Sequence, residues 1–171
     1  MRVALTGTPG TGKTTIAKLL RKKGYNVTDL NFLAEEKECI IGYDKERDTK
    51  IVDLKKLEKS IEDDKILEGH FAHEFEVNTV IVLRTHPDIL KTRLEKKGFS
   101  IKKVNENLEA EAMGIITEEA IEKYGNDKVF EVDTSVKEEE VLDKVIVIIE
   151  QKEKKYLAGK IDWSMEILKW Y

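Results

Sequence analysis

Short apolar runs alternate along this chain with segments whose apolar residues recur at every third or fourth position. The run at 79–83 is β-branched and continuously apolar, as expected for a strand in the middle of a parallel sheet. Other short runs have the same length and flanking turn residues. The five predicted strands cover residues 3–5, 25–29, 65–70, 79–84 and 128–132.

The segments between the strands carry the helical recurrence, and the predicted helices cover residues 16–22, 32–38, 54–61, 87–97, 101–124 and 138–149. We expect Thr85 and Ser100 to cap the helices that follow them, and Thr134-Ser135 with Glu138 to form a capping box. The stretch 42–49 is polar and charged, which predicts a loop or mobile flap. Strands and helices in alternation predict an α/β domain of three layers around a five-stranded parallel sheet.

The strongest chemical motif follows the first predicted strand. The segment Gly7-Thr-Pro-Gly-Thr-Gly12-Lys13-Thr14 fits the phosphate-binding pattern GxxxxGK[ST], between a strand and a helix as that pattern requires. Glycines let backbone N–H groups turn inward around phosphate oxygens, the Lys13 ammonium suits the outer phosphates, and the Thr14 hydroxyl suits Mg²⁺. A glycine-rich turn without a ligand is the alternative. The predicted nucleotide-binding residues are Gly7, Gly10, Thr11, Gly12, Lys13, Thr14 and Thr15.

Polar residues follow several of the predicted strands. In parallel sheets ligands bind outside the carboxyl ends of the strands, so these residues should converge there with the phosphate loop. We expect the strand ending near Glu68 to deliver that carboxylate and His70 into solvent. Arg84 is expected to contact phosphate, with helix capping or a salt bridge as its alternative role. His73 and His86 are expected at the surface. The converging set is Asp29, Glu68, His70, Arg84 and the turn at Asp133.

Composition limits the classes of function. The 171 residues are expected to form one domain, and a net charge of −4 gives no general reason to bind nucleic acid directly. The single cysteine, Cys39, excludes an internal disulfide. The longest apolar run, at 145–149, is far too short to span a bilayer, so no membrane partner is expected. Since no leader segment is recognisable, we expect a cytoplasmic protein.

The phosphate loop indicates a nucleotide but not a reaction. The guanine-selecting motif Asn-Lys-x-Asp is absent, and the chain is much shorter than motor or transporter ATPases. Several further motifs are present: Gly42-Tyr43-Asp44 with Asp48 nearby, Glu68-Gly69-His70, the segment 82–85 and the segment 93–98. Together with the phosphate loop they resemble the adenylate kinase isoenzyme 6 family, nuclear and archaeal adenylate kinases tied to maturation of the small ribosomal subunit. The resemblance covers roughly residues 3–124.

This resemblance implies a P-loop NTPase fold like that of nucleoside monophosphate kinases, with Mg²⁺ and ATP as cofactors. It implies phosphoryl transfer from ATP to AMP or a similar monophosphate, ATPase activity, and transient binding of a small-subunit ribosomal protein. By position, residues 29–52 would form the monophosphate-binding flap and residues 96–106 the lid. Residues 151–171, charged and then aromatic, are expected to form a C-terminal tail on their own composition. The family's Asp-x-His motif falls on Glu68 and His70, which would make Glu68 a metal ligand beside Thr14. The family's lid arginine falls on Lys97.

Two departures from the family pattern bear on activity. Glu68 replaces an aspartate, and Glu35 stands where relatives carry a flap arginine. The chain has only five arginines, Arg2, Arg21, Arg47, Arg84 and Arg93, although transfer between two nucleotides concentrates charge that forked guanidinium groups usually bind. We therefore predict weak monophosphate kinase activity with readily detected ATPase, in which Lys13, Glu68, His70 and Arg84 are the catalytic candidates.

Several alternatives remain open at the level of sequence. The protein is either this kinase, another small-molecule kinase of the same fold, or an ATP-driven assembly factor with negligible kinase activity. The lysines Lys96, Lys97, Lys102 and Lys103 form either a closing lid or a solvated face. The aromatic residues of the tail, Trp163, Trp170 and Tyr171, either pack on the outer helices or form a partner site.

Overall fold

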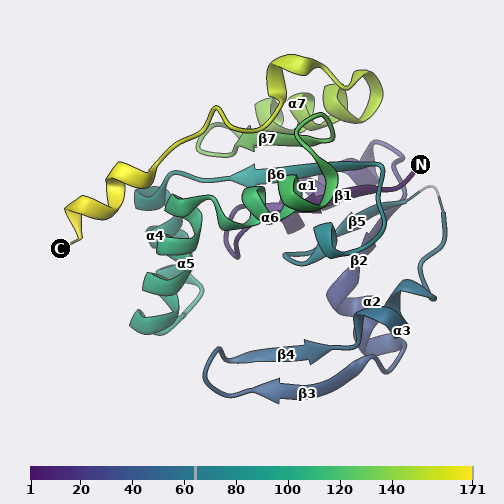
Figure 1. The fold of residues 1–171 in the computed structure, drawn as a ribbon, viewed down its shortest axis with the longest axis horizontal. Coiled ribbons are helices and arrows are strands. Elements are labelled where there is room, and N and C mark those ends of the chain that lie inside the picture. The colour runs from purple at the N-terminus through teal and green to yellow at the C-terminus, as the bar shows by residue number, and fades with distance from the viewer. Residues whose placement is uncertain (64, 171) are drawn as a thin grey trace.

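The computed structural model describes residues 1–63 and 65–170, and a five-stranded sheet lies at its centre (Figure 1). The strand order is β2-β5-β1-β6-β7, and every neighbouring pair is parallel. This arrangement confirms the predicted α/β class and the predicted parallel sheet. The strands are β1 (Val3–Thr6), β2 (Val27–Asp29), β5 (Ile66–Glu68), β6 (Thr79–Arg84) and β7 (Val129–Asp133).

Helices connect the strands and cover the sheet. They are α1 (Lys13–Lys22), α2 (Leu30–Glu36), α3 (Leu54–Glu58), α4 (Pro87–Lys96), α5 (Ile101–Met113), α6 (Ile115–Tyr124) and α7 (Glu138–Gln151). Short 3-10 helices occur at Ala72–Glu74, Lys154–Tyr156 and Ser164–Lys169. Among the residues described, no helix combines the length and the apolar character needed to cross a membrane.

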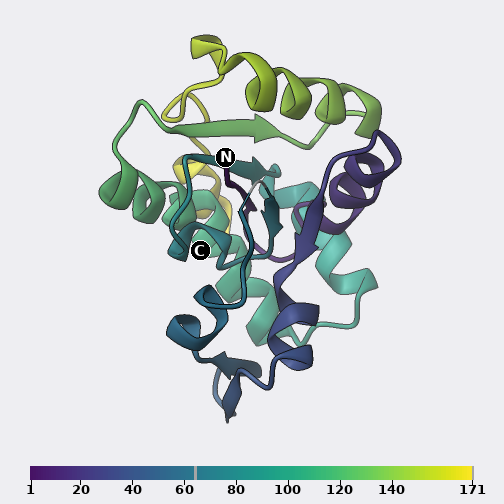
Figure 2. The ribbon, with the colours of Figure 1, turned by 90° about the vertical axis from the view of Figure 1, so that its right-hand side faces the viewer.

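The two faces of the sheet have separate hydrophobic cores because side chains alternate along each strand. On β1, Val3 and Leu5 pack into a core with α1 and α7. Ala4 points to the other face, where the core includes residues of α2, α3 and α6. Figure 2 shows α1 and α6 on opposite sides of the sheet, so the domain has the predicted three layers.

A third, smaller core joins α4 to α5. It contains Leu90, Leu94, Val104 and Leu108, with Phe99 and Trp170 packed against it. The two helices therefore form one packed unit, and the turn between them, residues 97–100, lies within the segment predicted as the lid.

The segment predicted as a loop or mobile flap at 42–49 is a turn at residues 45–48 flanked by two strands, so the loop prediction holds for the turn and is wrong for the strand residues. Strands β3 (Ile40–Asp44) and β4 (Thr49–Val52) pair antiparallel and project from the body of the domain (Figure 1). The Asp44 carboxylate accepts hydrogen bonds from the backbone N–H groups of Glu46 and Arg47 and so shapes the turn. Ile41 and Ile51 are exposed, so the usual apolar signal of a buried strand is absent.

The predicted long helix at 101–124 is divided into α5 and α6 at Gly114. Gly114 has φ 67°, a left-handed conformation that ends α5 and begins α6. The longest helix is consequently α7, with 14 residues against 13 in α5.

Two predicted helix caps are also wrong. Helix α4 is capped by His86, whose Nδ1 accepts from the N–H of Asp88 at 3.3 Å, while Thr85 is buried and bonded to Thr134. Helix α7 starts at Glu138, and its N-cap residue, Lys137, makes no side-chain capping bond. Thr134 instead donates its hydroxyl to the carbonyl of Arg84 at 3.0 Å. The hydroxyls of Thr85 and Thr134, which were predicted to cap helices, therefore connect the ends of β6 and β7. The Ser100 cap of α5 is confirmed.

Candidate active site

The phosphate loop, residues 7–12, turns sharply between the end of β1 and the start of α1. Gly7 has φ 144°, and a Cβ atom there would lie 2.5 Å from the carbonyl oxygen of Leu83. That distance is inside van der Waals contact, so only glycine allows the loop to pass β6 this closely. The loop backbone thus packs directly against the central sheet.

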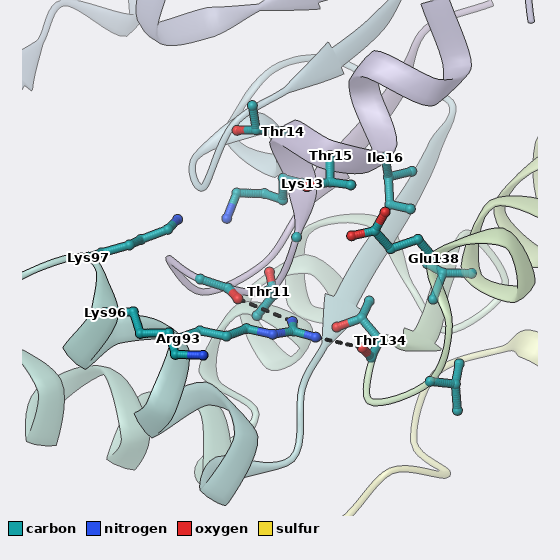
Figure 3. Close-up of a pocket in the computed structure, with 14 residues that line it drawn as sticks. Thr11, Lys13, Thr14, Thr15, Ile16, Arg93, Lys96, Lys97, Thr134 and Glu138 are labelled. Atoms are coloured by element: carbon teal, nitrogen blue, oxygen red, sulfur yellow. Dashed lines mark hydrogen bonds between the residues drawn. The ribbon is translucent and has the colours of Figure 1, made fainter. Parts of the chain in front are cut away.

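Lys13 is buried at the first position of α1, and its Nζ donates to the carbonyl oxygens of Gly7 at 2.8 Å and Thr8 at 3.0 Å. Burial lowers the pKa of the Lys13 ammonium from 10.5 to about 8. The carboxylate of Glu68 opposes this shift, whereas Lys97 adds to it. Figure 3 shows the Lys13 and Lys97 side chains pointing toward one another. Lys13 is therefore a cation at neutral pH in a site that disfavours its charge.

A cavity of about 380 Å³ opens beside the loop (Figure 3). Its walls include the loop and start of α1 on one side, the end of α4 on another, and the start of α7 on a third. Of the predicted nucleotide-binding residues, Gly10, Thr11, Gly12, Lys13, Thr14, Thr15 and Lys97 line it. Gly7 is not among the lining residues, because it lies against the sheet.

Arg93 joins the walls of this cavity. Its guanidinium donates to the carbonyl oxygen of Gly10 at 3.3 Å and to that of Thr134 at 3.0 Å. A cation on α4 thus connects the phosphate loop to the segment after β7. Arg93 itself lies in the wall of the cavity.

Glu68 and Asp29 lie side by side at the carboxyl ends of β5 and β2, where they are register partners. Glu68 is only 5% exposed, so the prediction that it points into solvent is wrong. Burial raises the pKa of the Glu68 carboxyl, and the charge of Asp29 raises it further, while Lys13 and Arg21 lower it. Two adjacent carboxylates supply the oxygen donors that Mg²⁺ prefers, so this pair fits the ion.

His70 follows β5 and lines a second cavity of about 510 Å³. Burial lowers the pKa of the His70 imidazole to about 4, and the charge of Lys13 contributes to the shift. His70 is therefore neutral at physiological pH. The cavity is also lined by residues of α2, of the hairpin and of the start of α3, and by Phe71; they are Asn31, Glu35, Ile40, Tyr43, Asp48, Thr49, Lys50, Val52, Leu54 and Phe71.

The charges around this second cavity are largely paired. Lys50 bonds to Glu35, and the Lys103 ammonium donates to the Asp48 carbonyl at 2.8 Å. None of the residues described along its walls is an arginine, and Arg47, in the nearby hairpin turn, is largely exposed. Among the described lining residues, Lys50 is therefore the one that carries a fixed positive charge.

Arg84 does not reach either cavity, which corrects its predicted contact with phosphate. The side chain is buried, its Nε donates to Glu111 at 2.9 Å, and its Nη1 pairs with Glu131. The salt-bridge alternative is the one observed. Sequence reasoning missed Glu111 and Glu131, although Glu111 stands three residues after Leu108 on the apolar face of its helix, which was an available signal.

His73 was expected at the surface, but it is 4% exposed. Its Nδ1 lies 3.1 Å from the Thr6 hydroxyl and its Nε2 lies 3.0 Å from Glu119. His73 therefore links the end of β1 to α6 beneath the phosphate loop.

The aromatic residues of the tail pack on the domain. The Trp163 ring lies 5.2 Å from the Arg84 guanidinium and 5.6 Å from the His86 ring. Trp170 packs on the core between α4 and α5. Tyr171 lies outside the described residues. Trp163 and Trp170 thus follow the packing alternative.

Comparison with known proteins gives consistent findings. A family model described as "AAA domain" matches residues 3–114. A Pyrococcus abyssi protein is 44% identical and covers 96% of this chain and 92% of its own length. One from Archaeoglobus fulgidus is 41% identical, covering 98% and 94%. Both are named "Putative adenylate kinase".

Solved structures share the fold at low sequence identity. A deoxyadenosine kinase from M. mycoides superposes with a TM-score of 0.56 at 14% identity, covering 90% of this chain and all of that one. The protein TT1252 from Thermus thermophilus gives 0.57 at 20% identity, covering 87% and 95%. At these identities the likeness concerns the fold alone.

Proposed function

This chain belongs to the same family as these archaeal relatives, a family of P-loop nucleotide kinases, and we propose that it transfers the terminal phosphoryl group of ATP to AMP or a related monophosphate. One observation carries the proposal: Lys13 lines the cavity beside the phosphate loop, and its charge also lowers the pKa of His70, which lines the second cavity. A donor and an acceptor nucleotide require two such cavities that share one cation.

In this proposal ATP occupies the cavity beside the phosphate loop. The backbone N–H groups of the loop and the Lys13 ammonium bind the phosphates, with Lys97 as a second point charge from the lid segment 96–106. Arg93 holds the loop against the segment after β7. The acceptor occupies the second cavity under the flap, residues 29–52.

We assign Thr14 and Glu68 as the residues that hold Mg²⁺, with Asp29 beside Glu68. When bound, Mg²⁺ neutralises charge on the transferring phosphoryl group. The chain's own residues support this assignment, because Asp29 raises the pKa of Glu68 and a cation would relieve that repulsion. Replacing the shorter aspartate of the family, Glu68 still offers carboxylate oxygens at the end of β5.

We also propose ATPase activity, with His70 orienting a water or the acceptor oxygen as a neutral imidazole. Two features favour hydrolysis relative to transfer. The second cavity lacks arginine among its described lining residues, and Glu35 and Asp48 each neutralise a lysine there. Forked guanidinium groups normally bind the crowded phosphates of the transfer reaction, and here Arg84 is withdrawn into the interior.

The test measures ADP formation from ATP and Mg²⁺ with and without AMP. We expect measurable turnover without AMP, less than about a tenfold increase with AMP, and loss of both in Lys13→Met, because the loop cation serves each reaction. Lys18→Met, an exposed position on the same helix, is the matched control. A large AMP stimulation would contradict the balance proposed. Turnover with a nucleoside in place of AMP would identify another small-molecule kinase.

A second role follows from the motif resemblance stated above: transient, ATP-controlled binding of a basic ribosomal protein of the small subunit. The acidic net charge of −4 is compatible with such a partner. Capture from a cell lysate with ATP and without nucleotide tests it. We expect a small-subunit protein to be recovered in one nucleotide state only, and recovery of none in either state would remove this role.

A further inference from the structure

Glu111 is a buried carboxylate that joins three elements outside both cavities. It lies in the last turn of α5 and is 2% exposed. Its Oε1 accepts from the Arg84 Nε at 2.9 Å and from the backbone N–H of Thr85 at 2.9 Å. Its Oε2 accepts from the Thr8 hydroxyl at 2.6 Å. Each carboxylate oxygen is therefore engaged, and one of them holds the phosphate loop.

Thr8 connects this carboxylate to the catalytic lysine. Its side chain is 3% exposed, and its backbone carbonyl accepts from Lys13 Nζ at 3.0 Å and from the N–H of Thr11 at 3.3 Å. The hydrogen bond to Glu111 fixes the Thr8 side chain, and the carbonyl of the same residue orients the Lys13 ammonium. A short chain of hydrogen bonds thus runs from α5 through Thr8 to Lys13.

Helix α5 also reaches the second cavity. Lys103, in its first turn, donates to the carbonyl of Asp48 in the hairpin turn. The 13 residues of α5 span about 20 Å at 1.5 Å per residue. Glu111 therefore anchors the phosphate loop to an element that also contacts the flap.

We propose that Glu111 is a positioning residue for nucleotide binding: through the Thr8 hydroxyl it holds the phosphate loop in the conformation that directs Lys13 at the nucleotide. The inference rests on the proposed function only in taking ATP as the ligand of the loop. A purely structural role, neutralising Arg84, is the competing explanation.

Glu131 provides a control that distinguishes the positioning role from the purely structural role. It pairs with the same guanidinium from β7, and it is buried to a similar degree, 6% against 2% exposed. Its other partners are the Thr117 hydroxyl at 2.8 Å and the N–H of Gly159 at 2.9 Å. None of these partners belongs to the phosphate loop. Glu131→Gln therefore perturbs the ion pair without perturbing Thr8.

The experiment compares Glu111→Gln, Glu131→Gln and Thr8→Val by titration calorimetry with ATP and Mg²⁺, alongside urea unfolding. We expect both glutamine variants to lower the unfolding midpoint, because each removes a charge from a buried pair. Only Glu111→Gln and Thr8→Val should raise the Kd for ATP, by about tenfold. The double variant Thr8→Val with Glu111→Gln should have a Kd for ATP within about twofold of that of Glu111→Gln alone, because both substitutions remove the same Thr8–Glu111 hydrogen bond.

An unchanged Kd in Thr8→Val, or an equal rise in Glu131→Gln, would overturn the inference. Thr8→Val keeps the test decisive if Glu111→Gln does not fold, because it retains the pairing of Arg84. The outcome is also separate from the proposed transfer to AMP, since no monophosphate is present in the titration. A wild-type protein that binds ATP but does not phosphorylate AMP would refute the kinase proposal and leave this inference standing.

Discussion

Replacing Lys13 by methionine is expected to stabilise the fold while it removes nucleotide binding. The Lys13 ammonium is buried, and the fold lowers its pKa from 10.5 to about 8. Between these two values the unfolded chain binds more protons than the folded protein, so stability rises with pH in that window. Below pH 8 both states carry the proton, and the folded state carries the full cost of the buried charge.

The size of the effect follows from the shift. At 1.36 kcal/mol per pKa unit, the buried charge costs the folded state about 3 kcal/mol at pH 7. Raising the pH from 7 to 10 should recover about 2.5 kcal/mol of this in the wild type. Methionine has no charge to titrate, so the stability difference between Lys13→Met and wild type should shrink by that amount over the same interval.

The assay is urea unfolding of both proteins at pH 7 and pH 10, without nucleotide and with a chelator present. Titrating groups that do not interact with Lys13 are common to the two chains and cancel in the difference. Lys18→Met, on the exposed side of the same helix, should change the free energy of unfolding by less than about 0.5 kcal/mol at either pH. A stability difference between Lys13→Met and wild type that does not change with pH would refute the reasoning.

Three further predictions concern the loop, the interior and the pH profile. Gly7→Ala should abolish ATP binding in calorimetry and lower the melting temperature, because the new Cβ would meet the Leu83 carbonyl at 2.5 Å; retained affinity would contradict the loop geometry. Arg84→Met should cost about 3–5 kcal/mol in urea unfolding because two buried carboxylates lose their cation, and a loss of ATP affinity with unchanged stability would restore a phosphate role. Because the pKa of His70 is lowered to about 4, kcat/KM should show no inflection from this group between pH 5.5 and 7.5; an inflection near pH 6.5 that disappears in His70→Gln would show otherwise.

The phosphate loop illustrates what was predictable. Its glycines, Lys13 and the flanking strand and helix are all near neighbours in sequence, so local conformational demands identify the site. The continuous apolar run of β6 likewise predicted a central strand. The cavity beside the loop then gathers nearly all the residues predicted to bind nucleotide.

The errors share a different origin. Hairpin β3–β4 depends on backbone pairing between exposed residues, so its sequence carried no core pattern. Gly114 was overlooked because the apolar residues on either side of it continue a helical spacing across the break. Thr85 and Thr134 were assigned as caps, yet each is 5% exposed or less and finds its partner far along the chain.

The sequence by itself determined the class of fold, the position of the phosphate loop and the identity of its cation, because those features depend on residues close together in the chain. Only the tertiary structure decided where Arg84 points. A strand-end arginine has the same local sequence whether it meets phosphate or protein, and Glu111 and Glu131 lie 27 and 47 residues away. Their carboxylates bind the guanidinium in the interior, where a buried charge requires a partner. The ion pair that removes an arginine from the site thereby places Glu111 against the phosphate loop.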